Sequence, residues 1–488
     1  MANSIGVSPL LPGWEYLADA EPHIFGERLY LIGSHDRFGG TRFCENNYVG
    51  WSAPLSDLSD WRFEGVTYDK TQDPANADGR LALWAPDAVQ GEDGRFYLYY
   101  CLADHPRIGV AVCETPAGRY RFLDYVRDPQ GVPLGQRPGD TRPFDPAVLR
   151  DDDGRIHLYA GQGPLSPRMA RTHARTHCFV FHMELEADMI TLRTEPRALL
   201  PNITNSDGTG FEGHEFFEAS SIRKFDGRYY FIYSSVLSHE LCWAVSDRPD
   251  SGFSYGGTLV SNGDIGLAGP VPMGYNSKAN PGVRNYIGNT HGSVEKINGA
   301  YYVFYHRHTN RRMSSRQSCA APITMTADGR FLQAEMTSCA LCGDLPGTGF
   351  FEARIACQLF SANGALYSAH PMVQNRRHPA FTQDEPDAQE GRQYIANLRD
   401  GASAVYKYFR FGADTPLPTS LCATIRGKCS GSLLLRDETG ALLASIPLVP
   451  ARSWTSFRAP LRIGAGRHAL CFTYQGRGYA DFMDFTLL

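Results

Sequence analysis

The chain has 488 residues, more than one ordinary hydrophobic core accommodates, so we expect more than one domain. Its formal net charge of -5 argues against nucleic acid or an anionic membrane as a partner, because both favour basic patches. Hydrophobic residues make up 42% of the chain and aromatic residues 12%, which suits a soluble protein rich in packed β-sheets or in aromatic clefts that stack on sugar rings.

The start of the chain, MANSIGVSPLLPGW, shows neither a basic segment nor a long apolar run, so no secretory signal is visible. No apolar run of transmembrane length occurs either. These features predict a cytoplasmic protein whose 12 scattered cysteines are reduced. Cys339 and Cys342 form a CxxC pair, but no second pair follows at zinc-ribbon spacing.

Five short segments, each a turn followed by an aromatic and β-branched run, resemble one another at separations of 60 to 73 residues. They are GERLYLIGS (26–34), DGRFYLYYC (93–101), DGRIHLYAG (154–162), DGRYYFIYS (226–234) and NGAYYVFYH (298–306). Further short β-like runs lie between them, and long helical periodicity is nearly absent. The repeat predicts a five-bladed β-propeller. A two-sheet sandwich is the alternative, but it does not explain why one strand motif recurs five times.

Each repeat also has an ionisable residue 10 to 12 positions before its aligned aromatic or histidine. These residues are Asp19, Asp87, Asp145, Glu218 and His291. Equivalent positions in a propeller point to equivalent places, so we expect the five side chains to converge near the mouth of the central channel. A turn or cap role is the alternative for any one of them. The interpretation as a turn or cap residue has less support for Asp145 and Glu218, because the DDDG and DG sequences that follow them already form the turns.

Carboxylates gathered across a pocket can hydrolyse a glycosidic bond. One protonated carboxyl donates a proton to the leaving oxygen, and an ionised one activates water or attacks the sugar. Glu218, flanked by Phe216 and Phe217, is the natural acid, because apolar surroundings keep a carboxyl protonated. Asp19 is the natural base, and Asp145 the natural modulator of the pKa of the acid.

Five segments in this order resemble family 43 of the glycoside hydrolases, over residues from about 15 to 320. They are DAEPHIFGERLYLIGSHD, WAPDAVQGEDGRFYLYY, FDPAVLRDDDGRIHLYAG, FFEASSIRKFDGRYYFIYSS and THGSVEKINGAYYVFYH. The resemblance implies a five-bladed propeller that acts on arabinose- and xylose-containing glycans, inverts the anomeric configuration and needs no organic cofactor.

The resemblance also implies roles for single residues, with Asp19 as general base, Asp145 as pKa modulator and Glu218 as general acid. Four more residues are expected to bind the substrate: Phe38 and Trp84 as aromatic walls, His291 near the channel centre and Arg316 reaching the sugar. His291 is also where a structural Ca²⁺ or Na⁺ is expected. No tight His/Asp spacing supports a catalytic metal.

The first motif departs from the family pattern. The usual Asp-Pro is replaced by Asp19-Ala20-Glu21-Pro22, so Glu21 is an alternative to Asp19 as the base, and Asp36 is a third candidate.

The five-fold pattern ends near residue 350, which predicts domains at 1–350 and 351–488. Residues 375–393 are polar and contain proline, and we expect them to form a loop. Short alternating strands follow, which predicts a β-sandwich of jelly-roll type. The segments YIANLRDGASAVYKYFRF, RGKCSG and GRGYADFMDFTLL resemble carbohydrate-binding module family 6, although the loop aromatic expected around 402–404 is missing. Tyr394 and Trp454 are the candidates for sugar binding, and bracing of the propeller is the alternative role.

The expected activity is the removal of α-L-arabinofuranosyl or β-D-xylosyl units from the ends of oligosaccharides. An endo-acting arabinanase and a non-catalytic carbohydrate-binding propeller are the alternatives. A kelch or WD scaffold would carry its own repeat signature, which is absent. The choice between arabinose and xylose stays open, as does the oligomeric state.

Overall fold

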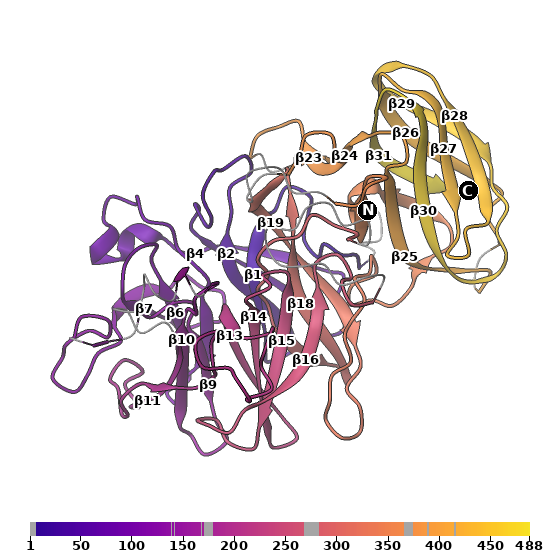
Figure 1. The fold of residues 1–488 in the computed structure, drawn as a ribbon. Helices are drawn as coiled ribbons and strands as arrows, with labels where there is room; N and C mark the ends of the chain where they lie inside the picture. The colour runs from indigo at the N-terminus through magenta and orange to yellow at the C-terminus, as the bar shows by residue number, and fades with distance from the viewer. Residues whose placement is uncertain are drawn as a thin grey trace.

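Two all-β bodies lie side by side, and residues 7–14 lie where they meet (Figure 1). The computed structural model describes residues 6–137, 139–140, 142–166, 168–169, 179–267, 283–365, 374–387, 390–413 and 416–488. No helix in these ranges is long and apolar enough to cross a membrane. The eleven cysteines they contain are free thiols.

The larger body is a five-bladed propeller, as the repeat predicts. Each blade is an antiparallel sheet whose strands follow in chain order, and in three of the neighbouring pairs of blades the first strands contact one another. The strands of the first two blades are β1 (Leu17–Phe25), β2 (Arg28–His35), β3 (Tyr48–Pro54), β4 (Arg62–Tyr68), β5 (Asp87–Gln90), β6 (Phe96–Cys101), β7 (Ile108–Cys113) and β8 (Arg121–Tyr125), with the short 3₁₀ helices η1 (Lys70–Gln72) and η2 (Pro74–Asn76) between them. The other three blades are formed by β9 (Ala147–Arg150), β10 (Ile156–Gly161), β11 (Val180–Leu185), β12 (Arg197–Ala198), β13 (Phe216–Phe225), β14 (Arg228–Ser235), β15 (Glu240–Ser246), β16 (Ser254–Ser261), β17 (Val294–Ile297), β18 (Ala300–Thr309) and β19 (Arg312–Ile323).

The repeated segments are the second strands of the blades, β2, β6, β10, β14 and β18. Two of the turns that precede them have both central residues at positive φ: Asp226 and Gly227 at 50° and 80°, and Asn298 and Gly299 at 51° and 86°. This geometry belongs to type I′ hairpins, for which Asp-Gly and Asn-Gly are the preferred pairs. The motif therefore fixes these two hairpins, and in all five blades the ionisable residue lies on or just before the first strand.

Five apolar clusters hold the ring together, each joining two neighbouring blades. Between the fourth and fifth blades, for example, Ile232 and Trp243 pack with Val303 and Tyr305. The cluster that closes the ring joins Leu29 of the first blade to Phe304 of the fifth, and it includes Leu10 and Leu11. The backbone amide of Leu10 also donates to the carbonyl of Ser318 in β19 at 3.0 Å, so the N-terminal segment runs along the last blade before it enters the first.

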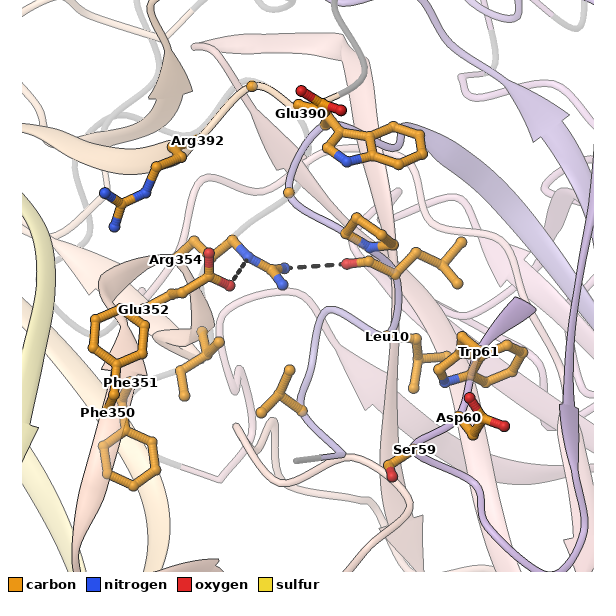
Figure 2. A pocket seen from close by; sticks show the side chains of 17 residues that line it. Leu10, Ser59, Asp60, Trp61, Phe350, Phe351, Glu352, Arg354, Glu390 and Arg392 are labelled. Carbon is orange, nitrogen blue, oxygen red and sulfur yellow. Dashed lines mark hydrogen bonds and ion pairs between the residues drawn. The ribbon is translucent and has the colours of Figure 1, made fainter. Parts of the chain in front are cut away.

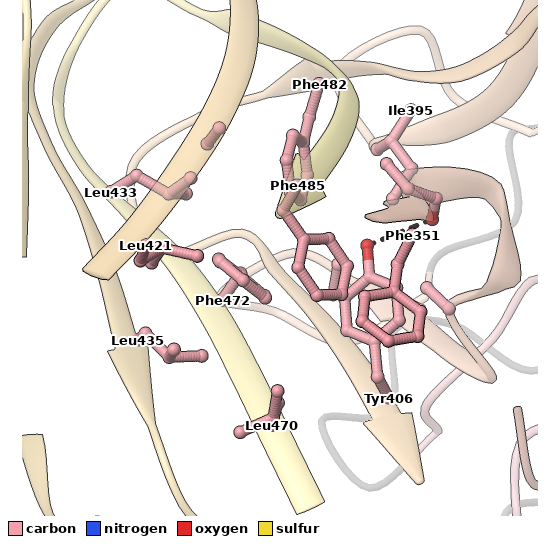
Figure 3. Packing of buried hydrophobic residues seen from close by; sticks show 14 of the residues in the cluster. Phe351, Ile395, Tyr406, Leu421, Leu433, Leu435, Leu470, Phe472, Phe482 and Phe485 are labelled. Atoms are coloured by element: carbon pink, nitrogen blue, oxygen red, sulfur yellow. Dashed lines mark hydrogen bonds between the residues drawn. The ribbon is translucent and has the colours of Figure 1, made fainter. Parts of the chain in front are cut away.

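The smaller body is a sandwich of two six-stranded sheets. One sheet contains β20 (Leu345–Pro346), β22 (Gln358–Phe360), β25 (Ser403–Phe411), β27 (Ser430–Arg436), β28 (Leu442–Leu448) and β30 (Gly466–Arg477); the other contains β21 (Gly349–Glu352), β23 (Ala380–Gln383), β24 (Gln393–Leu398), β26 (Ser420–Gly427), β29 (Ala451–Pro460) and β31 (Ala480–Leu487), and the 3₁₀ helix η3 (Ala353–Ile355) follows β21. Figure 3 shows the aromatic core between them, where the ring of Phe485 lies 4.9 Å from that of Phe472 and 5.0 Å from that of Tyr406.

Two details differ from the expectation for this half of the chain. The segment 375–393, expected to be a loop, contains β23, which pairs with β24. Its sequence AFTQ is too short for its alternation to stand out among the polar residues around it. The expected boundary at residue 350 falls within β21, and β20 before it already pairs with β25.

A buried arginine ties the two bodies together. The guanidinium of Arg307 in β18 donates to the carbonyl of Arg354 at 2.6 Å and to Oε1 of Gln393 at 3.0 Å, and it lies 3.7 Å from the ring centroid of Phe381. Because these contacts are buried and directional, they hold the sandwich in one orientation on the propeller.

Replacing Phe485 with alanine is expected to lower the free energy of unfolding of the sandwich by about 3–5 kcal/mol, because this fully buried ring fills the centre of the core. The measurement is urea unfolding followed by circular dichroism. Phe63→Ala is the matched control, because Phe63 is 40% exposed, and its loss should be about 1 kcal/mol or less. Equal losses for the two variants would contradict this description of the core.

Candidate active site

All five blades contribute to one cavity of about 230 Å³ at the centre of the propeller. Most of its lining comes from the first strands and from the segments just before them. The lining residues are Asp19, Phe43, Cys44, Trp84, Ala85, Phe144, Asp145, Gln162, Glu218, Asn289, His291 and Arg316. The lining therefore combines three carboxyls, two cationic groups and three aromatic rings.

Six of the seven site residues expected from the sequence line this cavity, and Phe38 does not. The backbone amide of Phe38 donates to Oδ1 of Asp387 at 3.2 Å, and its ring packs 5.4 Å from that of Tyr16. Phe43, in the same loop, lines the cavity instead, with the guanidinium of Arg316 4.9 Å from its ring centroid. The assignment of Phe38 as a wall is therefore corrected to Phe43, because the path of this loop, which the sequence does not reveal, decides which ring turns inward.

Four of the five ionisable residues that the repeat singles out line the cavity, and Asp87 does not. Asp87 starts β5 at the expected place, but it does not line the cavity. Its carboxylate lies 2.6 Å from Nε2 of His23 and accepts from the amide of Val148 at 2.8 Å. Asp87 therefore links the first three blades to one another, while the other four ionisable residues line the cavity.

Asp19 is held ionised by the residues around it. It lies at a β-bulge of β1 with φ at 52°, which turns its side chain out of the strand and into the cavity. Arg316 Nη1 donates to its Oδ1 at 2.6 Å, His306 Nδ1 lies 3.3 Å from the same oxygen, and Ser34 donates to Oδ2. Burial alone would raise the pKa of Asp19, but Arg316 and His306 outweigh it and hold the pKa well below its usual range.

The two other candidates for the base are engaged elsewhere. Asp36 is fully buried and accepts from Nε and Nη2 of Arg316 at 2.8 and 2.9 Å. Glu21 accepts from Nη2 of Arg223 at 2.9 Å and from the hydroxyl of Ser221 at 3.1 Å. Neither carboxylate lines the cavity, so Asp19 is the one of the three that a substrate can reach.

Glu218 and Asp145 form a coupled pair of carboxyls. Burial raises the pKa of Glu218 to about 7, although Gln162 Nε2 donates to its Oε2 at 3.1 Å and favours the ionised form. Burial, together with the negative charges of Glu218 and Asp19, raises the pKa of Asp145 well above its usual value. Near neutral pH the pair of Glu218 and Asp145 therefore retains a proton, whereas Asp19 is ionised. Glu218 is partly exposed to the cavity, whereas Asp145 is buried.

His291 supplies a positive charge between two carboxylates. Its Nδ1 lies 3.7 Å from Oδ2 of Asp145, and its Nε2 lies 3.6 Å from Oε1 of Glu21. Burial alone would lower the pKa of His291, but Glu21, Asp145 and Asp19 outweigh it and raise the pKa to about 9. The ring is therefore an imidazolium at neutral pH.

The residues around His291 do not by themselves fit the Ca²⁺ or Na⁺ expected there. Ca²⁺ takes about six to eight oxygen ligands. The described neighbours of His291 offer two carboxylates, of which Glu21 is already paired with Arg223.

Several lining residues were not foreseen from the sequence. Phe144 packs at 4.7 Å against Trp84, nearly edge to face, and together they form one wall of the cavity. Phe144 directly precedes Asp145, Asn289 lies two residues before His291, and Gln162 directly follows β10. Each adjoins a residue or strand that the repeat singles out, so the blade repeat is the signal that could have found them.

The sandwich residues considered for sugar binding are engaged within the protein. Arg426 lies over the rings of both Tyr394 and Trp454, at 4.7 and 4.3 Å from their centroids. The same guanidinium donates to both carboxylate oxygens of Asp384 at 2.7 and 2.9 Å. Each of the two rings therefore already packs against a fixed cation, which favours a structural role for this cluster.

Known proteins share this architecture. The model of the family "Glycosyl hydrolases family 43" matches residues 25–331. A xylosidase/arabinosidase from Thermoclostridium stercorarium is 47% identical over 483 residues, which cover 98% of each chain. The crystal structure of the GH43_1 enzyme from Xanthomonas citri complexed with xylotriose superposes with a TM-score of 0.52 at 26% identity, covering 68% of this chain and 94% of that one.

A fourth similarity extends over both bodies. The structure of an arabinoxylan arabinofuranohydrolase from Bacillus subtilis, 20% identical, covers 98% of this chain and 96% of its own at a TM-score of 0.50, and so has the same fold throughout. With well over half of its residues matched by the family model and a 47% identical relative over its full length, the chain belongs to family 43 of the glycosyl hydrolases.

Proposed function

We propose that the protein is an inverting, exo-acting glycoside hydrolase that removes α-L-arabinofuranosyl or β-D-xylosyl residues from plant-type oligosaccharides. One observation carries the proposal: a single small cavity contains the carboxylate of Asp19, paired with Arg316 at 2.6 Å, and the carboxyl of Glu218, whose pKa burial raises to about 7. Opposite protonation states in one pocket are what acid–base hydrolysis of a glycoside requires. The printed names of relatives, xylosidase/arabinosidase and beta-xylosidase, support the choice of sugars.

Each carboxyl then has a distinct task. Asp19 takes a proton from water, and that water attacks the anomeric carbon. Glu218 donates its proton to the glycosidic oxygen as the C–O bond breaks. We assign the donated proton to Glu218 because it is the more exposed of the two carboxyls that line the cavity. Asp145 is buried, 3.7 Å from His291, and acts through its coupling to Glu218.

The neighbouring cations and rings prepare the site for this reaction. Arg316 keeps Asp19 ionised and oriented, because its guanidinium is fixed at the same time by Asp36. Trp84, Phe144 and Phe43 give the pocket apolar faces against which a sugar ring can pack.

The size of the cavity favours exo action over endo action. At about 230 Å³ it is smaller than the roughly 300–1,000 Å³ typical of sites for drug-sized ligands, so it suits a terminal sugar rather than a bound chain of several. A non-catalytic sugar-binding propeller would not need two carboxyls with opposite pKa shifts.

Replacing Glu218 with glutamine or alanine is expected to lower kcat on xylo- or arabino-oligosaccharides by about 10²–10⁴-fold, because the leaving oxygen loses its proton donor. Nitrophenyl α-L-arabinofuranoside and β-D-xylopyranoside should lose less, since nitrophenolate leaves without protonation. Glu212→Ala, which removes an exposed carboxylate from the loop before β13, is the matched control. Full activity of the Glu218 variants would show that the acid lies elsewhere, and hydrolysis of none of these glycosides by the wild type would remove the sugar assignment.

The pH profile should report the proton on Glu218. Since the acid must be protonated and its pKa is about 7, kcat/KM on oligosaccharides is expected to fall as the pH rises above about 7. Gln162→Leu removes a hydrogen bond that favours the ionised form, so it should raise the pKa and move this alkaline limb to higher pH. A limb that stays in place or moves to lower pH in Gln162→Leu would contradict the assignment.

A further inference from the structure

A second cavity, separate from the candidate active site, lies along the seam between the propeller and the sandwich (Figure 2). Its volume is about 690 Å³, three times that of the 230 Å³ cavity in the propeller. One side is formed by the N-terminal segment around Leu10 and by Ser59–Trp61; the other is formed by residues around β21 and by residues 390–392. Its volume is large enough for more than one sugar ring, whereas that of the active-site cavity suits a single terminal sugar.

Aromatic side chains face this groove from both bodies. Trp14 and Trp61 line it from the propeller side and are half-buried. Phe350 lines it from the sandwich and is 53% exposed, although it lies within β21. Figure 2 shows Phe350 and Trp61 on opposite sides of the groove, with Arg354 between them. Aromatic rings that stay at least partly exposed on both sides of one groove indicate a ligand with apolar faces.

Planar charged groups line the same groove. Arg354 is buried, and its guanidinium donates to Glu352 at 2.7 Å and to the carbonyl of Leu11 at 3.2 Å, which fixes it at the floor. Asp60, Glu390 and Arg392 are exposed at the rim. Carboxylates and guanidiniums each offer two parallel hydrogen-bonding atoms, an arrangement that matches neighbouring hydroxyls on a sugar ring.

The charges of the residues that line the groove indicate which class of ligand it can bind. The lining has three carboxylates, Asp60, Glu352 and Glu390, and two guanidiniums, Arg354 and Arg392, so the charges nearly cancel. A nucleic acid would require a basic groove. The core of a protein interface is depleted of charged residues, whereas this floor contains a fixed ion pair. A neutral, polyhydroxylated chain can pack its sugar rings against the aromatic side chains and form hydrogen bonds with the charged groups.

We propose that the seam groove binds a segment of a neutral polysaccharide, specifically the pentose-rich main chain of arabinoxylan, at a site distinct from the active site. The choice of arabinoxylan among neutral polysaccharides rests on the function proposed above. Because residues of both bodies form the groove, the sandwich contributes to substrate capture through the seam rather than through Tyr394 and Trp454.

The test is affinity electrophoresis in native gels containing soluble arabinoxylan. Wild type should be retarded, and Phe350→Ala combined with Trp61→Ala should weaken the apparent affinity by at least about fivefold, the loss typical of removing an aromatic anchor. Phe350→Ser alone is the second variant, because Phe350 is exposed and its loss leaves the cores intact. Phe63→Ala, an exposed phenylalanine outside the groove, should bind like wild type.

Catalysis is measured separately, so that the two proposals fail independently. The groove variants should retain kcat/KM on nitrophenyl pentosides while losing it on polymeric arabinoxylan, and Glu218→Gln should still be retarded in the gel. The inference is overturned if wild type is not retarded by arabinoxylan, or if the groove variants are retarded as strongly as wild type. It is also overturned if light scattering shows a wild-type dimer that these variants dissociate, since the groove would then be covered by a second copy of the chain.

Discussion

The buried guanidinium of Arg316 is the interaction on which both the closure of the ring and the character of the site depend. It lies in β19 of the last blade, yet it contacts Asp19, Asp36 and the thiol of Cys44, all from the first blade. Residues almost 300 positions apart therefore meet in one network of buried charges. Such a network is stable only if each charge keeps its partner, since an unpaired buried charge is costly.

The apolar clusters between the blades make this network possible. Each cluster joins two neighbouring blades, and the last of them includes the N-terminal segment, so the ring is closed by hydrophobic packing at every seam. Packing fixes the five first strands around the centre, and the bulges in β1 and β13 turn Asp19 and Glu218 inward. The positions of the reacting carboxyls thus follow from the packing of apolar side chains that take no part in the reaction.

The electrostatic contrast within the pocket follows from these positions. Asp19 has a guanidinium 2.6 Å away, whereas among the described residues the donor to the carboxyl of Glu218 is the amide of Gln162, at 3.1 Å. Burial acts on both, but only Asp19 has a cation close enough to overcome it. One site can therefore hold an ionised and a protonated carboxyl at the same pH, as acid–base catalysis of glycoside hydrolysis requires.

The fold and most of the pocket residues could be predicted from the sequence, because the five-fold repeat determines both. Asp-Gly and Asn-Gly turns mark the second strand of a blade, and counting back from that strand finds Asp19, Asp145, Glu218 and His291. The prediction was wrong where the path of a loop determines which side chain points into the cavity. Phe38 and Phe43 lie in the same loop, and nothing in their sequence says which ring turns inward. The pairing of Arg316 with Asp36, the short strand β23 and the seam groove all depend on contacts between distant segments, which no local pattern records.

The configuration of the first sugar released tests the central claim most directly, because it reports on the division of labour between Asp19 and Glu218. Proton NMR during hydrolysis of a xylo- or arabino-oligosaccharide distinguishes the two anomers before they mutarotate. If Asp19 activates water while Glu218 protonates the leaving oxygen, the anomer opposite to that of the substrate accumulates first. First release of the anomer with the substrate's own configuration would mean that a carboxylate attacks the sugar directly, and would contradict the role assigned to Asp19.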